Sequence, residues 1–240
     1  MASQVKFALF DLDGLLIDTE SIYTLTLPDE ILAPYGCEMT YEIKSGLMGK
    51  NEAQATAHLF NALPPIALTP DEYIQQRRKL QDQRWPRVQL MPGAARLISH
   101  LHRHGIPIAI ATGSSRAEFT LKTAHLQDVF KLFEGRAICS DDTQMAGRNS
   151  KPAPDVFIEA AKLLGVDLPE EGADGIVFED AIPGVLAGTA AALNVVWVPD
   201  PNLAKLVAAS RDGGFVVPEG VHRLPSLEAF DPEKFGLPPF

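Results

Sequence analysis

The chain has 240 residues, of which 46% are hydrophobic and 22% charged, and a formal charge of −10. This composition is typical of a globular protein with a full core, and the acidic balance disfavours nucleic acid polymers and anionic membranes as partners. No run approaches the ~20 apolar residues of a membrane helix, and we expect no signal peptide because a strand begins at once. Cys37 and Cys139 lack metal or disulfide spacing. We expect them to be core residues of a cytoplasmic protein.

The first predicted element is a short strand, Val5–Phe10, and two carboxylates follow it directly. Asp11 and Asp13 are two positions apart, so on extended backbone they share a face. They would lie at the carboxyl end of a strand, where open α/β sheets bind their ligands. Two adjacent carboxylates repel each other unless a metal, a proton or counter-ions offset the charge. The plainer interpretation is an Asp/Gly turn ending at Gly14, which the pair alone favours.

Residues 18–88 have apolar positions at helical spacing and no convincing strand. The clearest predicted helices are Glu52–Leu63 and Pro70–Trp85. We predict a small helical cap domain over 18–88, joined by two chain crossings to a catalytic core formed by 1–17 and 89–240. The alternative is that these helices simply cover one face of the sheet.

From about Met91 onward, predicted strands and helices alternate along the chain. The predicted strands are Ile106–Ala111, Arg136–Cys139, Gly175–Phe178 and Val195–Val198. The predicted helices are Pro92–His104, Ser115–His125, Pro154–Leu164 and Pro183–Leu193. This alternation predicts an α/β fold with a parallel sheet and helices on both faces. The proline-containing tail Asp231–Phe240 is expected to be an extended strap along the core.

Two further segments have residue types that suit a phosphate. Thr112-Gly113-Ser114-Ser115 follows a predicted strand and opens a helix, where hydroxyls, backbone N–H groups and the macrodipole favour an anion. An ordinary serine N-cap would explain this turn as well. Pro152 and Pro154 stiffen the chain around Lys151, whose ammonium group could then neutralise a phosphoryl group and a carboxylate. The alternative is an exposed lysine, the usual state of this residue.

Two adjacent acids, Glu179 and Asp180, end the apolar strand Gly175–Phe178. Their oxygens suit a hard cation such as Mg²⁺, which keeps several waters and takes one or two protein carboxylates. Each of these signals is weak alone. All of them lie at the ends of strands in one predicted sheet, so the side chains can converge on one point.

The ordered segments Asp11-Leu12-Asp13-Gly14, Thr112-Gly113-Ser114, Lys151-Pro152 and Glu179-Asp180 resemble the four motifs of the haloacid dehalogenase-like superfamily of phosphotransferases. The resemblance covers nearly the whole chain. It implies a Rossmann-like core with a helical cap inserted after the first strand. It also implies that Asp11 attacks phosphorus as the nucleophile and that Asp13 acts as general acid and base. The second aspartate argues against a dehalogenase or an ion-pumping ATPase.

The same resemblance implies the ligands of a magnesium ion and of the phosphoryl group. Mg²⁺ would lie between the Asp11 carboxylate, the Asp13 backbone carbonyl and the Asp180 carboxylate, with Glu179 ligating through water or orienting the site. The phosphoryl oxygens would be held by Thr112 and by the backbone N–H groups of Gly113 and Ser114. Lys151 would balance the negative charge.

Several segments are similar, more narrowly, to the eukaryotic pseudouridine-5'-phosphatases of this superfamily, among them Asp180-Ala181, Val198-Pro199-Asp200 and the closing Phe235-Gly236-Leu237-Pro238. The cap departs from the pattern at Pro28, which leaves the substrate open. Lys50 on a cap loop is a candidate substrate ligand, and so are Asp18 and Glu20. A surface lysine and a helix N-cap at Asp18 are the alternatives.

We therefore expect a Mg²⁺-dependent phosphatase of a small phosphomonoester, with pseudouridine 5'-phosphate as the best single substrate. The alternatives are a sugar-phosphate phosphatase of other specificity, a β-phosphoglucomutase-like mutase, and a catalytically silent binding protein on the same fold. The expected partner is a small phosphorylated metabolite, with no nucleic acid polymer and no membrane, and the expected state is a monomer.

Overall fold

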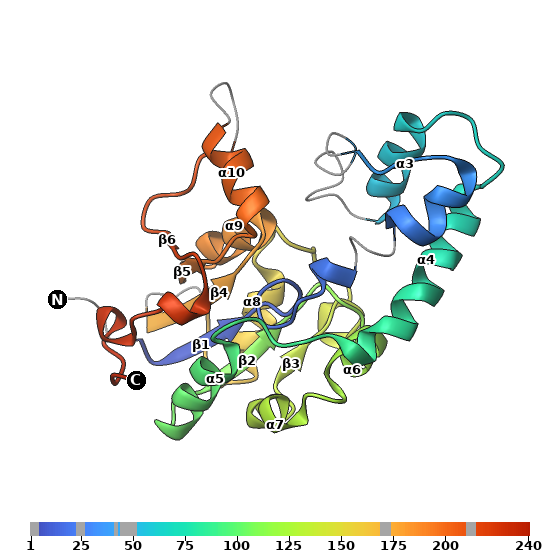
Figure 1. The fold of residues 1–240 in the computed structure, drawn as a ribbon. Coiled ribbons are helices and arrows are strands. Elements are labelled where there is room, and N and C mark those ends of the chain that lie inside the picture. Colours follow the sequence, from blue (N-terminus) through green and yellow to red (C-terminus); the bar gives the residue numbers. More distant parts are fainter. Residues whose placement is uncertain (1–4, 23–26, 41–42, 44–51, 169–173, 210–214) are drawn as a thin grey trace. The chain divides into compact units, whose positions relative to one another are not determined.

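The fold comes from a computed structural model, which describes residues 5–22, 27–40, 43, 52–168, 174–209 and 215–240 (Figure 1). The chain divides into two compact units. The larger unit comprises Met1–Asp18 and Gln89–Phe240, and the smaller unit comprises Thr19–Val88. The role of the smaller unit as a cap stays a prediction.

The larger unit is built on a six-stranded sheet in the order β3-β2-β1-β4-β5-β6, and every strand pairs with its neighbour in parallel. The strands are β1 (Phe7–Phe10), β2 (Ile108–Ala111), β3 (Ala137–Ile138), β4 (Gly175–Glu179), β5 (Asn194–Trp197) and β6 (His222–Arg223). The central strands are continuous apolar runs because helices cover both of their faces. The predicted parallel sheet is confirmed, although β6 was not predicted, since it has only two polar, exposed residues.

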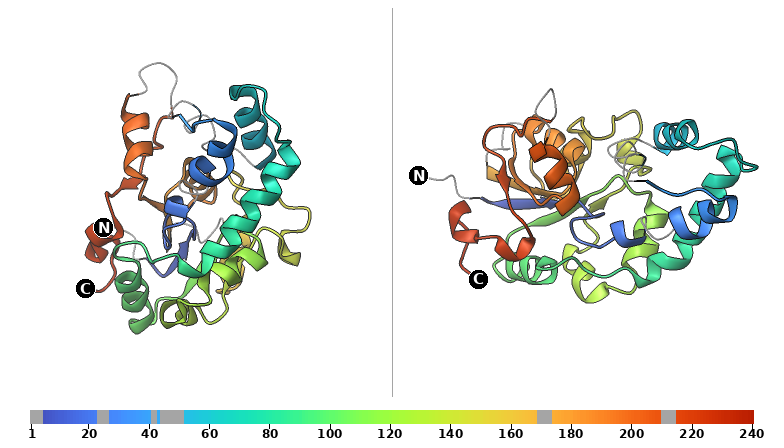
Figure 2. Two further views of the ribbon diagram at one scale, coloured as in Figure 1. Left: turned by 45° about the vertical axis from the view of Figure 1, so that its right-hand side comes forward. Right: turned by 45° about the horizontal axis from the view of Figure 1, so that its top comes forward.

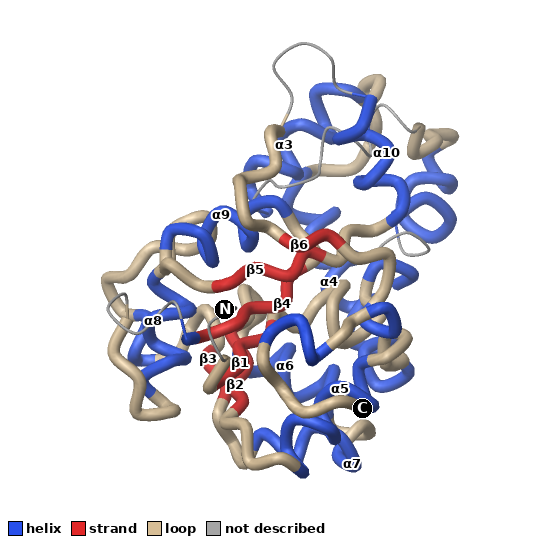
Figure 3. Tube along the Cα trace, turned by 90° about the vertical axis from the view of Figure 1, so that its left-hand side faces the viewer, coloured by secondary structure: helices blue, strands red, loops and turns tan. Residues whose placement is uncertain are grey.

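Helices cover both faces of the sheet, as predicted (Figure 3). One face packs against α8 (Asp155–Lys162) and α9 (Ile182–Ala190), in a core that includes the fully buried Phe157 and Trp197. The other face lies against α5 (Ala94–Arg103), which also contacts α7 (Gln127–Phe130).

Aromatic rings fill the core on the α5 face of the sheet. Phe10 of β1 stacks on Phe178 of β4 with 4.9 Å between ring centroids. Phe133 packs edge-on against Phe10, and Phe230 packs edge-on against Phe178. The two strands that end at the acidic residues are therefore fixed against each other by aromatic packing on this face.

Several shorter elements complete the larger unit. They are the helices α6 (Arg116–Thr123) and α10 (Pro201–Ala209) and the 3-10 turns η4 (Lys131–Phe133), η5 (Thr143–Met145), η7 (Leu227–Ala229) and η8 (Pro232–Phe235). Of the helices in this unit, α7 (Gln127–Phe130) and α10 (Pro201–Ala209) were not predicted, and α7 has only four residues, too few for a helical period to show.

The C-terminal tail corrects one prediction. Instead of an extended strap throughout, it forms the 3-10 turn η8, with Phe235 and Leu237 buried. The Val5 N–H donates to the Phe235 carbonyl at 3.0 Å, and the His100 ring nitrogen Nε2 lies 2.9 Å from the Pro238 carbonyl. The tail thus runs beside β1 and α5 (Figure 2). Its 3-10 turn begins at Pro232 and ends at Gly236, whose backbone is left-handed, and neither residue gives a periodic pattern that predicts the turn.

The elements that the structure describes in the smaller unit are helices and helical turns. Its elements are η1, a π-helical turn (Leu27–Leu32), η2 (Ala33–Tyr35), α3 (Glu52–Ala62), α4 (Pro70–Arg84) and η3 (Trp85–Arg87). Thr69 caps α4 in a reciprocal pairing with Glu72, and Leu59, Leu63 and Tyr73 are among its buried core residues. In neither unit is a described helix long and apolar enough to cross a bilayer.

Candidate active site

Four of the predicted site residues lie at the carboxyl ends of three neighbouring strands. Asp11 follows β1, Thr112 follows β2, and Glu179 is the last residue of β4, directly before Asp180. The sheet continues into these positions, because the Asp11 N–H donates to the Phe178 carbonyl at 3.0 Å. The strand order therefore brings residues from distant parts of the sequence to one edge of the sheet.

Lys151 joins these strand ends through one ammonium group. Its Nζ donates to Asp11 Oδ1 at 2.5 Å, to Glu179 Oε1 at 2.6 Å and to the Ala111 carbonyl at 2.9 Å. Burial alone would lower the pKa of Lys151, but the charges of Asp11 and Glu179 outweigh it and raise that pKa. Lys151 is therefore a fixed cation, with each of its three hydrogens directed at an acceptor.

Glu179 is 1% exposed and has both carboxylate oxygens occupied by donors. Besides Lys151 on Oε1, the backbone N–H groups of Asp180 and Ala181 donate to Oε2 at 3.1 and 3.2 Å. Gly184 at the start of α9 leaves room for this carboxylate, since a Cβ there would overlap it. Glu179 thus orients Lys151 and the Asp180 backbone.

Asp180 contributes an oxygen without a partner. Its Oδ1 is buried and has no hydrogen bond in the part of the chain that the structure describes. The Trp197 indole N–H donates to the Asp180 carbonyl at 2.7 Å and fixes the backbone. Gly14 has φ +84°, and a Cβ there would overlap the Asp180 carboxylate, so glycine permits both the turn and the close approach.

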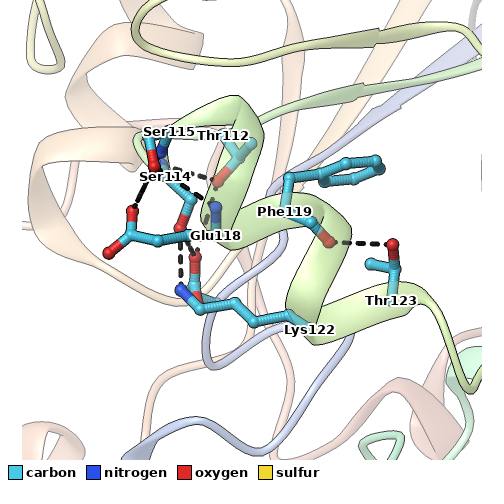
Figure 4. A network of polar contacts seen from close by, with 8 residues as sticks. Thr112, Ser114, Ser115, Glu118, Phe119, Lys122 and Thr123 are labelled. Carbon is cyan, nitrogen blue, oxygen red and sulfur yellow. Dashed lines mark hydrogen bonds and ion pairs between the residues drawn. The ribbon is translucent and has the colours of Figure 1, made fainter. Parts of the chain in front are cut away.

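Asp13 belongs to a second polar network, and Figure 4 labels its partners Thr112, Ser114 and Lys122 on the hydroxyl turn and helix α6. The Ser114 hydroxyl donates to Asp13 Oδ2 at 2.6 Å. Lys122 Nζ donates to Asp13 Oδ1 at 2.7 Å and to Ser114 Oγ at 2.8 Å. The Thr112 hydroxyl lies 3.5 Å from Asp13 Oδ2 and accepts the Ser114 N–H at 3.0 Å.

Lys122 is the residue of this site that the sequence interpretation missed. It is fully buried, whereas Leu121 beside it is 38% exposed, which inverts the usual pattern of a covering helix. The helical spacing from Ser115 and Glu118 was the available signal, since it places Lys122 on the face that begins at the hydroxyl turn.

The combined charges of the two networks fit a hard divalent cation. The networks hold four carboxylates and two ammonium groups, those of Asp11, Asp13, Glu179, Asp180, Lys122 and Lys151. If all are charged, the formal charge is −2. One oxygen from each of Asp11, Glu179 and Asp180 lies within 4.8 Å of the others. The unpartnered Asp180 oxygen and this all-oxygen donor set suit Mg²⁺.

Burial and mutual repulsion disturb the ionisation of these acids. Burial raises the pKa of Asp11 to about 7, although Lys151 acts in the opposite direction. Burial, with the Asp11 and Glu179 charges, also raises the pKa of Asp180 well above its usual range. The positive charge of Lys151 is thus too small to keep the pKa values of these carboxyl groups in their usual range, and a bound divalent cation would add positive charge beside them.

The remaining predicted ligands lie in different places. Gly113 is exposed beside Thr112, and Ser115 caps α6 with Glu118, so the N-cap interpretation holds for Ser115. Asp18 ends the first segment of the larger unit, where its N–H donates to the Gln89 carbonyl at 2.9 Å. Glu20 is half-buried in the smaller unit, and Lys50 lies outside the described residues. Substrate binding by Asp18, Glu20 and Lys50 stays a prediction.

Comparisons with known proteins show the family of this chain. A sequence model of the haloacid dehalogenase-like hydrolases matches residues 5–192. A probable pseudouridine-5'-phosphatase of Drosophila melanogaster is 38% identical over 99% of this chain and 96% of its own. An Arabidopsis thaliana (DL)-glycerol-3-phosphatase is 37% identical over 98% of this chain and 93% of its own.

Solved structures share the fold along nearly the whole chain. A haloacid dehalogenase-type hydrolase from Entamoeba histolytica has a TM-score of 0.75 at 22% identity, covering 96% of this chain and 97% of its own. A hydrolase of the same type from Deinococcus radiodurans, solved with bound phosphate and sodium, has a TM-score of 0.72 at 24% identity, covering 99% of this chain and all of its own. The family resemblance drawn from the four ordered motifs is confirmed, and the chain belongs to the haloacid dehalogenase-like hydrolase family, as a phosphatase.

Proposed function

We propose that this chain hydrolyses a small phosphomonoester with Mg²⁺ through an aspartyl-phosphate, and that its substrate is pseudouridine 5'-phosphate. The observation that carries the reaction is the placement of Asp11. Its carboxylate is bridged through Lys151 to Glu179, and one of its oxygens lies within 4.8 Å of an oxygen of Asp180. One nucleophilic carboxylate is thus held between a fixed cation and a candidate metal ligand.

In the first step, an Asp11 carboxylate oxygen attacks phosphorus opposite the leaving oxygen. The bond between Asp11 and phosphorus forms, the bond to the leaving oxygen breaks, and Asp13 gives that oxygen its proton. Lys151 and the Thr112 hydroxyl stabilise the charge on the phosphoryl oxygens. Bound Mg²⁺, held by Asp11, Asp180 and the Asp13 carbonyl, would neutralise further charge there.

In the second step, a water attacks the phosphorus of the aspartyl-phosphate. Asp13, deprotonated by the first step, takes the proton of that water, and the bond from phosphorus to Asp11 breaks. The products are inorganic phosphate and free Asp11. A mutase of this family would instead transfer the phosphoryl group to a sugar phosphate and would need a bisphosphate, so phosphate release without a bisphosphate separates the two activities.

The substrate is the open part of the proposal, because relatives of nearly equal identity are named for different substrates. The Drosophila relative supports pseudouridine 5'-phosphate, and the Arabidopsis relative supports glycerol 3-phosphate as a second candidate. The residues of the larger unit contact the phosphoryl group in either case. Substrate choice is therefore assigned to residues that contact the rest of the substrate, and Asp18, Glu20 and Lys50 are the candidates.

A substrate panel with released phosphate as the readout tests this assignment. We expect kcat/KM for pseudouridine 5'-phosphate to exceed that for glycerol 3-phosphate, uridine 5'-phosphate and hexose phosphates by about 10-fold or more, the discrimination that a few pocket contacts supply. Uridine 5'-phosphate is the matched control, because it differs only in the bond between base and ribose. Faster turnover of glycerol 3-phosphate or of a hexose phosphate would move the assignment to a sugar-phosphate phosphatase.

Metal binding can be tested apart from turnover. In excess Mg²⁺ at about 100 times Kd, the folded protein gains about 2.7 kcal/mol, and we expect the Tm to rise by about 5 °C over the metal-free protein. In Asp180→Asn this rise should disappear, because the neutral amide lacks the negative charge of the Asp180 carboxylate and is a weaker ligand for the cation. Asp174→Asn is the control, since Asp174 pairs with Lys6 on the surface. An unchanged Mg²⁺ response in Asp180→Asn would exclude Asp180 as a ligand.

A further inference from the structure

Lys122 is a cation that the proposed chemical steps do not use. Its side chain is fully buried in α6, although burial of a lysine requires removing its charge from water. Buried ion pairs seldom stabilise a protein more than apolar residues of similar size would. The neighbouring Leu121 is exposed, so helix α6 presents lysine inward and leucine outward. Stability alone does not account for this arrangement.

The contacts of Lys122 form a closed triangle with Asp13 and Ser114. Lys122 Nζ lies 2.7 Å from Asp13 Oδ1 and 2.8 Å from Ser114 Oγ, and Ser114 Oγ lies 2.6 Å from Asp13 Oδ2. An ammonium group only donates, so the serine oxygen must accept from it, and the single serine proton must point at Asp13. Lys122 therefore fixes the direction of the serine–aspartate hydrogen bond and binds the other carboxylate oxygen itself.

The triangle holds Asp13 from its buried side only. The Asp13 side chain remains 24% exposed, whereas that of Lys122 has no exposed surface. Each carboxylate oxygen has one short hydrogen bond, from Lys122 to Oδ1 and from Ser114 to Oδ2, so rotation of the carboxylate would break at least one of them. The exposed side of Asp13 is thereby held in one orientation before a substrate arrives.

We propose that Lys122 is a positioning residue for Asp13, and that it sets the efficiency of proton transfer to the leaving oxygen and from the attacking water. The inference rests on the proposed function, in which Asp13 makes both transfers. Without Lys122, Asp13 would keep Ser114 as its only close donor among the described residues, and the hydroxyl proton would no longer be confined to it. Loss of a positioned acid costs about 100-fold in rate, within the range for general acid–base catalysis.

Lys122→Met tests this role, because methionine has a similar length and no charge. For an alkyl substrate such as glycerol 3-phosphate, whose leaving alkoxide needs a proton, we expect kcat to fall about 100-fold with KM changed by less than about 3-fold. For p-nitrophenyl phosphate the leaving group needs no proton. Its first turnover should therefore stay within about 3-fold of the wild-type rate, followed by a slow steady state limited by the attack of water.

A structural defect would give a different pattern. If Lys122→Met slows the first turnover of both substrates equally, or slows neither, the positioning role is wrong. Thr123→Val is the matched control on the same helix, because Thr123 is buried and its hydroxyl donates to the Phe119 carbonyl at 2.8 Å. We expect this control to leave the rates with both substrates unchanged.

Ser114→Ala keeps the test decisive if Lys122→Met does not fold. This small change removes the third corner of the triangle, and we expect a loss of about 10-fold with the alkyl substrate and none in the first p-nitrophenyl turnover. Equal losses, or none, would overturn the role. Failure of the proposed function would be distinguishable from failure of this inference. In that case the wild-type protein would release no phosphate from either substrate, or Asp11→Asn would remain active.

Discussion

Asp11→Asn is expected to lower phosphate release by about 10⁴-fold or more, as removal of a catalytic nucleophile does in other hydrolases. The amide is a far weaker nucleophile than the carboxylate, and it has the same shape. It therefore fits between Lys151 and the sheet, and we expect the Tm to stay within about 3 °C of the wild-type value, in line with a substitution that creates no cavity. Stopped-flow phosphate release and thermal unfolding measure the two quantities.

The control for Asp11→Asn is again Asp174→Asn, which makes the same chemical change at a surface ion pair. It should retain full activity. Acid quenching of the wild-type enzyme during turnover should trap phosphate on the protein, and Asp11→Asn should trap none. Turnover by Asp11→Asn above about one hundredth of the wild-type rate would remove Asp11 as the nucleophile, since lost nucleophiles cost far more than that.

Lys151→Met is expected to have the largest effect on stability, lowering the free energy of unfolding by about 3 kcal/mol because it leaves a buried charge pair without its cation. Both partners of Lys151 are buried, with side-chain exposures of 10% for Asp11 and 1% for Glu179. Activity should fall by about 10³-fold or more, because the fixed positive charge at the phosphoryl group is lost. Urea unfolding without metal measures the first effect, and kcat/KM measures the second.

Lys162→Met is the matched control for Lys151→Met. Lys162 pairs with Glu159 at 2.9 Å, but its side chain is 46% exposed and Arg148 also contacts Glu159. We expect a change below about 0.5 kcal/mol, as for other exposed ion pairs, and unchanged activity. Equal destabilisation by the two variants would show that Lys151 is not the cation on which the buried carboxylates depend.

The fold could be predicted where one local pattern settles it. β1 and β2 are uninterrupted apolar runs, and so is β4 as far as Phe178, as expected for a parallel sheet that is buried on both faces. β6 has two polar residues and exists because β5 offers an open edge, so its own sequence contains no signal. The tail was misjudged for a related reason, since the 3-10 turn at Pro232–Phe235 depends on contacts with β1 and α5 that are distant in sequence.

In the candidate site, too, local sequence patterns predict some residues, and others depend on contacts that are distant in sequence. Asp11, Glu179 and Asp180 could be predicted to meet because each directly follows a recognisable strand, and strand ends converge at one edge of a parallel sheet. Lys122 could not be paired with Asp13 in this way, since 109 positions separate them and the helix residue follows no strand end. Its burial is a property of how α6 lies in the larger unit, which helical periodicity alone does not specify.

The hydrogen bond from the Trp197 indole to the Asp180 carbonyl gives the protein an internal optical reporter. The chain contains two tryptophans, and the other one, Trp85, lies in the smaller unit. The emission of a buried indole depends on the field of the groups that it contacts, so a cation arriving beside Asp180 acts directly on Trp197. A Trp85→Phe background isolates that fluorescence, and occupancy of the acidic cluster can then be followed in solution without a coupled assay or a label.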